Sequence, residues 1–241
     1  ATNVVVREGR IEIVADNSVT VSGVIAAPGG VGVRGGDIGI NAGGNVELNA
    51  GANLSVRGNG ANSAGGTVNI WADNNAIARR GALVDASAGS SGDGGFVEFS
   101  AKNTVELAGG EFRADGMGGG KAGSVLIDPI NIVVSADILR GAGGYGALPD
   151  GASAAGANLT LLADEAITVN DGVTISTRSV DGTTAADHDT GASTGNSGSL
   201  SLEAATISLK SGSKLLAGAD NSYTGGDVTL KATRNWTGEA K

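Results

Sequence analysis

The sequence predicts an all-β fold, a parallel β-helix in which three short strands make up each coil of about 28 residues. Three observations lead to this prediction: a recurring octet, a strict alternation of apolar residues within it, and 43 glycines among 241 residues. Aromatic residues make up only 3% of the chain. Such a composition does not suit an ordinary globular core, but it suits a narrow interior filled by small side chains.

The octet has the form small-small-x-apolar-x-apolar-x-Ala and recurs along the whole chain. Clear copies start at Gly35, Gly65, Gly94 and Gly225, and looser copies start at Glu8, Ala122, Gly156 and Ser197. Most starts are separated by 27 to 30 residues, whereas two intervals are longer, at 34 and 41 residues. A fixed period in this range is typical of a solenoid, here with two insertions.

Within each octet the apolar residues alternate with polar ones, which is the pattern of a strand with one buried face. Ile38 and Ile40 take the inward positions in one copy, and Val68 and Ile70 take them in the next. Two further alternating runs follow each octet, for example at 46–48 and 54–56, 105–107 and 112–114, and 167–169 and 173–175. One coil cannot bury its own apolar face, so coils are expected to stack about 4.8 Å apart.

The two long intervals contain Gly-, Ser- and Asp-rich segments at 140–155 and 179–196. Neither segment alternates, so both are expected to be loops that project from coil corners of a single domain over 1–241. His188 lies in the second segment between Asp187 and Asp189. We expect a solvated loop tip there rather than a metal or acid–base site, because no further ligand lies nearby in the sequence.

Charge and composition exclude several classes of function. The net charge of -9 argues against nucleic acid as a partner, because binding to phosphates needs a surface of Lys and Arg. Cysteine is absent, which excludes disulfides, thiolate metal sites and a cysteine nucleophile. No apolar run is long enough for a membrane-spanning helix, so no membrane insertion is expected. No cofactor or metal is expected either. The chain starts at Ala1 and is interpreted as a processed product or a fragment.

Enzymes that are built on β-helices place several carboxylates at equivalent outward positions of adjacent coils. The first outward column of the octets contains Arg10, Asp37, Thr67, Phe96, Ser124, Asn158, Ser199 and Asp227. No neighbouring pair of acids occurs in this column or in the two that follow it along the octet. The prediction is therefore that the protein is not an enzyme and has no catalytic residues.

Three exposed aromatic residues are candidates for contacts with carbohydrate, because an aromatic ring can stack on a sugar ring. Trp71 and Phe96 occupy outward positions one coil apart, and Tyr145 lies in the first long loop. The competing interpretation is that neighbouring loops cover these rings.

The segment 94–135 (GGFVEFSAKNTVELAGGEFRADGMGGGKAGSVLIDPINIVVS) resembles the two-partner secretion exoproteins, the filamentous haemagglutinin-like adhesin family. Leu126-Ile127-Asp128-Pro129, followed by an Asn-led apolar run, is similar to the closing element that recurs in that family. The Asn-Pro-Asn motifs of the family's amino-terminal secretion domain are absent, because the three prolines are Pro28, Pro129 and Pro149. The resemblance thus implies that the chain is a shaft fragment without that domain.

The resemblance implies a right-handed parallel β-helix, export through an outer-membrane transporter of the two-partner secretion system, and location outside the cell or at the bacterial cell surface. The expected function is that of a secreted adhesin or biofilm matrix protein that attaches to carbohydrate or to a host or bacterial cell-surface ligand. Two alternatives stay open: a carbohydrate-active β-helix enzyme, either a polysaccharide lyase or a hydrolase, and a passive spacer without a ligand.

Overall fold

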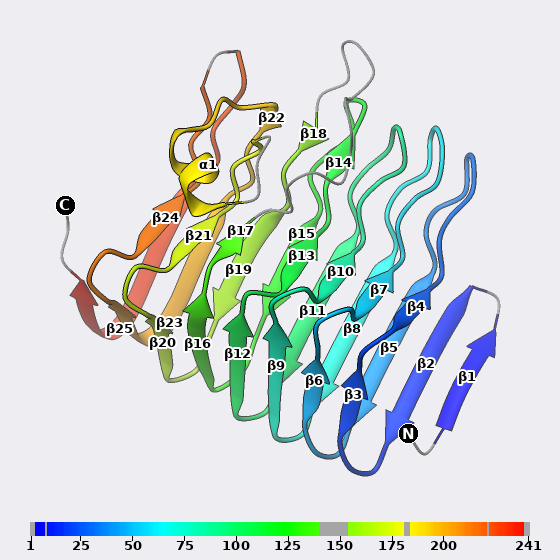
Figure 1. Cartoon of the computed structure of the whole chain (residues 1–241), viewed down its shortest axis with the longest axis horizontal. Helices are drawn as coiled ribbons and strands as arrows, with labels where there is room; N and C mark the ends of the chain where they lie inside the picture. The colour runs from blue at the N-terminus through cyan, green and yellow to red at the C-terminus, as the bar shows by residue number, and fades with distance from the viewer. Residues whose placement is uncertain (1–2, 8, 140–153, 181–183, 221, 239–241) are drawn as a thin grey trace.

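The computed structural model describes residues 3–7, 9–139, 154–180, 184–220 and 222–238. The chain forms a right-handed parallel β-helix of about 7 turns with roughly 29 residues in each (Figure 1). The predicted fold class and coil length are therefore confirmed. The two ends of the chain lie at opposite ends of the stack of coils (Figure 1).

The first face of the β-helix is built from the octets. Its parallel strands are β2 (Arg10–Ala15), β5 (Asp37–Ala42), β8 (Thr67–Ala72), β11 (Phe96–Ala101), β15 (Ser124–Ile127), β19 (Asn158–Leu162), β23 (Leu200–Leu209) and β25 (Val228–Gly238). Octet positions lie opposite one another throughout: Ile38 pairs with Val68, for example, and Val68 pairs with Val97. The alignment of the octets in the sequence is therefore the register in which the strands of this face pair.

The second and third faces come from the two runs that follow each octet. The second face contains β3 (Val19–Val21), β6 (Val46–Leu48), β9 (Asn75–Arg79), β12 (Thr104–Ala108), β16 (Asn131–Ala136), β20 (Ala166–Val169) and the distal halves of β23 and β25. The third face is divided between β4 (Val24–Ala26), β7 (Asn53–Ser55), β10 (Leu83–Asp85) and β13 (Glu111–Arg113), and β17 (Ile138–Leu139), β21 (Thr174–Ser176) and β24 (Lys214–Leu216).

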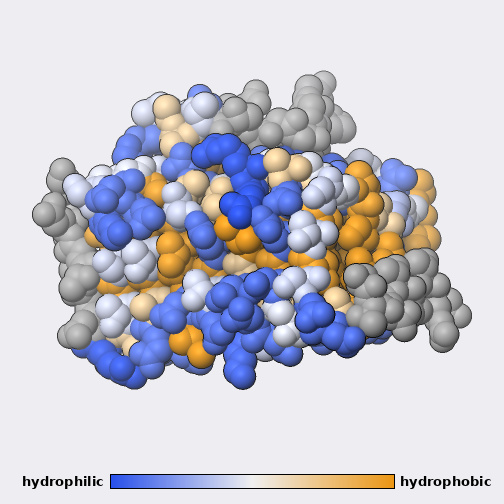
Figure 2. Space-filling view, turned by 60° about the horizontal axis from the view of Figure 1, so that its bottom comes forward, coloured by the Kyte–Doolittle hydropathy of each residue, from blue (hydrophilic) through white to orange (hydrophobic). Residues whose placement is uncertain are grey.

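The interior is one continuous column of apolar side chains. Ile38, Ile70, Phe99 and Leu161 are at most 1% exposed, as the alternation predicts. Outward positions are more polar, and Figure 2 shows hydrophilic side chains over much of the face that it presents, with apolar surface concentrated in a lengthwise band. The eighth octet differs, because β25 pairs only with β23 in the described part of the chain. Val228 and Leu230, which the pattern places inward, are 45% and 38% exposed.

The glycine pairs that open the octets at Gly35, Gly65 and Gly94 are required by close backbone approach in two directions. A Cβ atom on Gly65 would lie 1.7 Å from the carbonyl oxygen of Ala86, and one on Gly66 would lie 2.0 Å from that of Gly36. Gly94 and Gly95 show the same crowding, with carbonyl oxygens 2.0 Å away in both cases. Real Cβ atoms do not tolerate such distances, so each pair marks where the chain turns tightly into the first face.

Shorter loops project from every early coil, in addition to the two predicted excursions (Figure 1). They join the third face to the next octet over 27–35, 56–65, 86–94 and 114–123, and they stack through backbone hydrogen bonds such as Gly58 N–H to Ser87 O, 2.9 Å. The short strand β14 (Gly116–Met117) in the last of these loops pairs with β18 (Ala154–Ala155), and β18 pairs with β22 (Gly195–Asn196); β18 and β22 lie at the ends of the two long excursions, and the three strands form a small sheet. Only residues 154–155 of the first predicted excursion belong to the described part.

Two elements have no counterpart in the sequence prediction. Strand β1 (Asn3–Arg7) pairs antiparallel with β2 and occupies its free edge. The second excursion, expected to be a loop, contains the helix α1 (Ala185–Thr190), in which Thr184 and Asp187 form a capping box. That prediction is wrong for these six residues, because a helix this short can be stabilised by its cap without apolar periodicity. Among the described residues, no helix is long and apolar enough to cross a membrane.

Replacing Phe99 with alanine is expected to lower the free energy of unfolding by about 3–5 kcal/mol, because a buried aromatic ring is exchanged for a cavity. Phe99 is 0% exposed, and its ring centroid lies 5.5 Å from that of Phe112. Phe96→Ala, at an outward position of the same strand, is the matched control and should cost less than about 1 kcal/mol. Urea unfolding followed by circular dichroism measures both losses. Equal losses would contradict the assignment of inward and outward positions.

Gly65→Ala is expected to destabilise the β-helix by about 1–3 kcal/mol, because the added methyl group must displace the backbone at Ala86. Gly23→Ala is the matched control, because a Cβ atom at Gly23 has no neighbour within 4 Å. Both substitutions reduce the entropy of the unfolded chain similarly, so the difference between them isolates the crowding. Thermal unfolding gives this difference, and a Gly65→Ala protein as stable as Gly23→Ala would refute the explanation.

Candidate functional site

The structure separates the two aromatic candidates that it describes. Trp71 lies on β8 and Phe96 on the adjacent strand β11, but Phe96 pairs with Thr67 whereas Trp71 pairs with Ser100. The rings are thus four residues apart along the strand direction, about 13 Å. Trp71 is 39% exposed, and its indole Nε1 donates a hydrogen bond to Asp73 Oδ1 over 2.8 Å. Phe96 is half-buried. Tyr145, the third candidate, lies outside the described residues.

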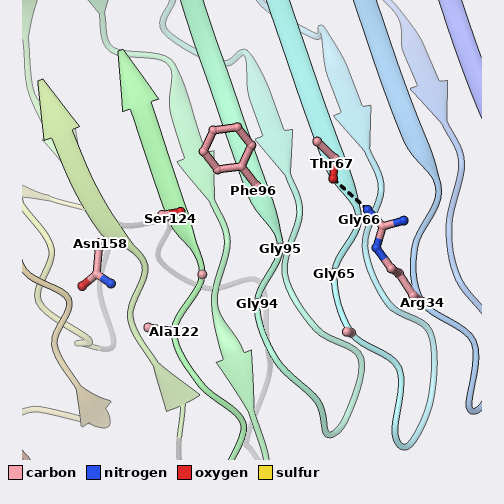
Figure 3. A pocket seen from close by; sticks show the side chains of 12 residues that line it. Arg34, Gly65, Gly66, Thr67, Gly94, Gly95, Phe96, Ala122, Ser124 and Asn158 are labelled. Carbon is pink, nitrogen blue, oxygen red and sulfur yellow. Dashed lines mark hydrogen bonds between the residues drawn. The ribbon is translucent and has the colours of Figure 1, made fainter. Parts of the chain in front are cut away.

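Phe96 lies in an open groove of about 480 Å³ on the first face. The glycine pairs that open two of the octets, at 65–66 and 94–95, line it together with outward side chains from four consecutive strands. In Figure 3, Phe96 lies between Thr67 and Ser124, and Arg34 and Asn158 mark the two ends. The four strands contribute register-equivalent residues: Thr67, Phe96, Ser124 and Asn158.

The polar groups along this groove retain hydrogen-bonding capacity for a ligand. Thr67 Oγ1 accepts a hydrogen bond from Arg34 Nη2 over 2.7 Å, and its own hydroxyl proton can still be donated. Asn158 Oδ1 accepts from the backbone N–H of Ser199 over 2.9 Å, which leaves its NH2 group pointing away from that bond. Arg34 also forms an ion pair with Asp37 at 2.9 Å. One aromatic ring among hydroxyl and amide groups is an arrangement suited to binding sugars.

Sequence reasoning identified Phe96 but missed its neighbours. Thr67, Ser124 and Asn158 all belong to the first outward column, where they are not carboxylates and so gave no indication of a catalytic cluster. The signal that could have found them is the single aromatic residue in a column that is otherwise polar. Arg34 carried no such signal, because it belongs to a projecting loop whose position relative to the face depends on the stacking of coils.

A second open groove, of about 440 Å³, lies on the second face. Glu47, Ile77 and Glu106 are register-equivalent there, on β6, β9 and β12. Both carboxylates have partners: Glu47 Oε1 accepts a hydrogen bond from Arg79 Nε, and Glu106 Oε1 accepts one from Ser135 Oγ over 2.7 Å. The acids are two strands apart, about 9.6 Å, too far to share one cation directly.

Two carboxylates on adjacent coils do influence each other, although the outward columns show no pair. Asp128 follows β15, Asp164 follows β19, and the backbone N–H of Asp164 donates to Pro129 O over 3.2 Å. Burial, together with the nearby Asp164 carboxylate, raises the pKa of Asp128 above its ordinary value. No outward column contains both acids, because Asp128 lies within its octet whereas Asp164 directly follows the octet that ends at Ala163, and the two meet at the corner between the first two faces.

His188 does not lie at a solvated loop tip. It is 0% exposed, and its Nδ1 lies 2.8 Å from Ser176 Oγ on β21. The expectation of a solvated tip is wrong, because α1 packs the imidazole against the third face although both sequence neighbours are acidic. Within the described residues, no group of three or more His, Cys, Asp or Glu side chains is placed to hold a metal ion.

Arg178 fastens the same helix to the body of the β-helix. Its guanidinium donates hydrogen bonds to the carbonyl oxygens of Asp189, 2.9 Å, and Gly191, 3.0 Å, which lie at the carboxyl end of α1. It also donates to Gly218 O in the following coil, over 3.1 Å. A hydrogen bond from the Ser193 backbone N–H, with the nearby Arg178 charge, holds the pKa of Asp220 below its ordinary value. These contacts make the excursion a docked structural element.

Comparisons with protein-family models, with curated proteins and with solved structures found no match to this chain.

Asp128→Asn is expected to stabilise the protein at neutral pH by at most about 1 kcal/mol, because water screens carboxylates that stay partly exposed. A folded-state pKa raised above 3.8 means that the folded protein favours protonated Asp128. The stability that this protonation provides is present below pH 3.8 and is lost as the pH rises through the folded-state pKa. The variant should therefore gain stability at pH 7 and match the parent protein near pH 3.

Thermal unfolding between pH 3 and pH 7 tests this expectation. Asp164→Asn is the companion variant and should give a smaller gain, because burial of Asp128 contributes more to the shift than Asp164 does. A loss of stability in Asp128→Asn at pH 7 would contradict the assignment.

Proposed function

We propose that the chain is a shaft segment of a secreted bacterial adhesin or biofilm matrix protein, which attaches to carbohydrate at a cell surface or in an exopolysaccharide. The observation that carries the proposal is the groove on the first face, where Phe96 lies among polar side chains on a rigid stack of coils. The stack of about 7 coils spans about 34 Å. In such a rod, outward side chains lie at a fixed spacing, and they can differ from coil to coil while the apolar interior stays the same.

The proposal includes no catalysis, and it includes export through the outer-membrane transporter of a two-partner secretion system. Support for the export route comes from the resemblance of 94–135 to that family. The net charge of -9 disfavours nucleic acid as a partner and is compatible with carbohydrate, whose recognition depends on hydroxyl groups and ring faces.

A carbohydrate-active enzyme is the second candidate function, and one observation favours it. General acids in enzymes that cleave glycosidic bonds need a raised pKa beside a second carboxylate. Burial and, to a smaller extent, the nearby Asp164 carboxylate raise the pKa of Asp128. The pair lies at a corner between two faces and does not line either groove described above.

The purified protein, fused to a fluorescent marker, is expected to bind a panel of immobilised glycans and to stay on biofilm cells that make exopolysaccharide. Cells stripped of exopolysaccharide should retain clearly less of the fusion protein. The amount bound is measured by fluorescence, with the marker alone as the control. Release of reducing ends or unsaturated products, abolished in Asp128→Asn, would establish the enzyme instead. Absence of binding to every glycan and to both cell types would leave a passive spacer.

A further inference from the structure

The groove on the first face has a repeat along the axis of the β-helix. Thr67, Phe96, Ser124 and Asn158 come from four consecutive strands at one register position, so their Cα atoms follow one another at the strand spacing of about 4.8 Å. That spacing is close to the length that one pyranose unit adds to an extended, β-linked sugar chain. The row spans about 14 Å, which accommodates three or four such units.

The order of side chains along the row matches the surface of such a sugar chain. A β-linked glucose unit with equatorial hydroxyl groups presents flat C–H faces, which stack on an aromatic ring, and hydroxyl groups at its edge. Phe96 supplies the ring, while Thr67 and Ser124 supply a hydroxyl group one coil to either side (Figure 3). The NH2 group of Asn158 is one coil further along, where the next sugar unit would present its hydroxyl groups.

The charges at the groove favour a neutral ligand. Arg34 is the one charged side chain among the residues that line it, and Asp37 neutralises that charge at 2.9 Å. The chain as a whole carries a net charge of -9, so an anionic polysaccharide would be repelled before it reached the groove.

We propose that this groove binds a neutral, β-linked linear glycan along the axis of the β-helix, with one sugar unit over each coil and Phe96 stacked beneath one of them. The proposal rests on the proposed function and names the ligand class and the site through which that function would act. The groove is a binding site only, and no bond in the glycan is broken.

Isothermal titration calorimetry with cello-oligosaccharides of two to six units tests both the site and the spacing. The association constant is expected to rise with each unit up to about four and then to level off, because longer chains extend beyond Asn158. Phe96→Ala should weaken binding of the tetramer about tenfold, as loss of one aromatic contact does. Phe96→Tyr should retain binding. Ser124→Ala should weaken it less than Phe96→Ala.

Trp71→Ala is the matched control, because Trp71 is an exposed aromatic residue on the neighbouring strand, outside the lining of the groove. Its association constant should equal that of the parent protein, and circular dichroism and thermal unfolding should show that all variants are folded. Acidic oligogalacturonates of equal length should bind at least tenfold more weakly. An association constant independent of chain length, unaffected by Phe96→Ala, or higher for the acidic oligomers would overturn the proposal.

The calorimetry and the exopolysaccharide assay together distinguish the groove proposal from the broader proposal of an adhesive function. If Phe96→Ala weakens cello-oligosaccharide binding as expected but the variant stays on exopolysaccharide as well as the parent protein does, adhesion uses another surface as well. If the parent protein binds exopolysaccharide but no cello-oligosaccharide, the groove proposal fails and the adhesive function stands. Absence of binding in both assays refutes the groove proposal and the adhesive function.

Discussion

The register between consecutive coils is the constraint on which every other feature of this molecule depends. Because each strand pairs with the equivalent strand of the next coil, every inward side chain lies directly above and below others of its own column. A side chain that is too large or too small disturbs two neighbours, so the column is filled by residues such as Val68, Val97 and Val125. The same register brings backbone against backbone at the turns, and only glycine fits there.

Sequence alone gave access to most of the fold, because a period of two inside a period of about 28 residues leaves few alternatives. The predicted runs at 46–48 and 167–169 lie within β6 and β20, and the octets pair as aligned. The sequence could not predict features that depend on local capping or on contacts between coils. Strand β1, helix α1 and the burial of His188 are of this kind, since no repeat encodes them.

The candidate site was predictable to a smaller extent, for a related reason. Phe96 was identified as an outward aromatic residue, but the groove around it also needs Arg34, which reaches the first face from a projecting loop. The packing constraint that makes inward positions predictable from the sequence does not apply to outward positions. Outward residues therefore vary from coil to coil. The interaction of Asp128 with Asp164 shows the same limit, because Asp128 lies within an octet whereas Asp164 lies just after one, so no single column contains both.

Parallel pairing of whole coils also determines how the rod responds to force. The hydrogen bonds that join neighbouring strands run along the long axis, so a pull between the two ends loads the contacts between coils in series, and the weakest junction opens first. Each coil that detaches frees roughly 29 residues, which extend to about 100 Å. Under flow, a tether of this construction would lengthen in discrete steps and dissipate energy at each one, instead of breaking at its attachment point.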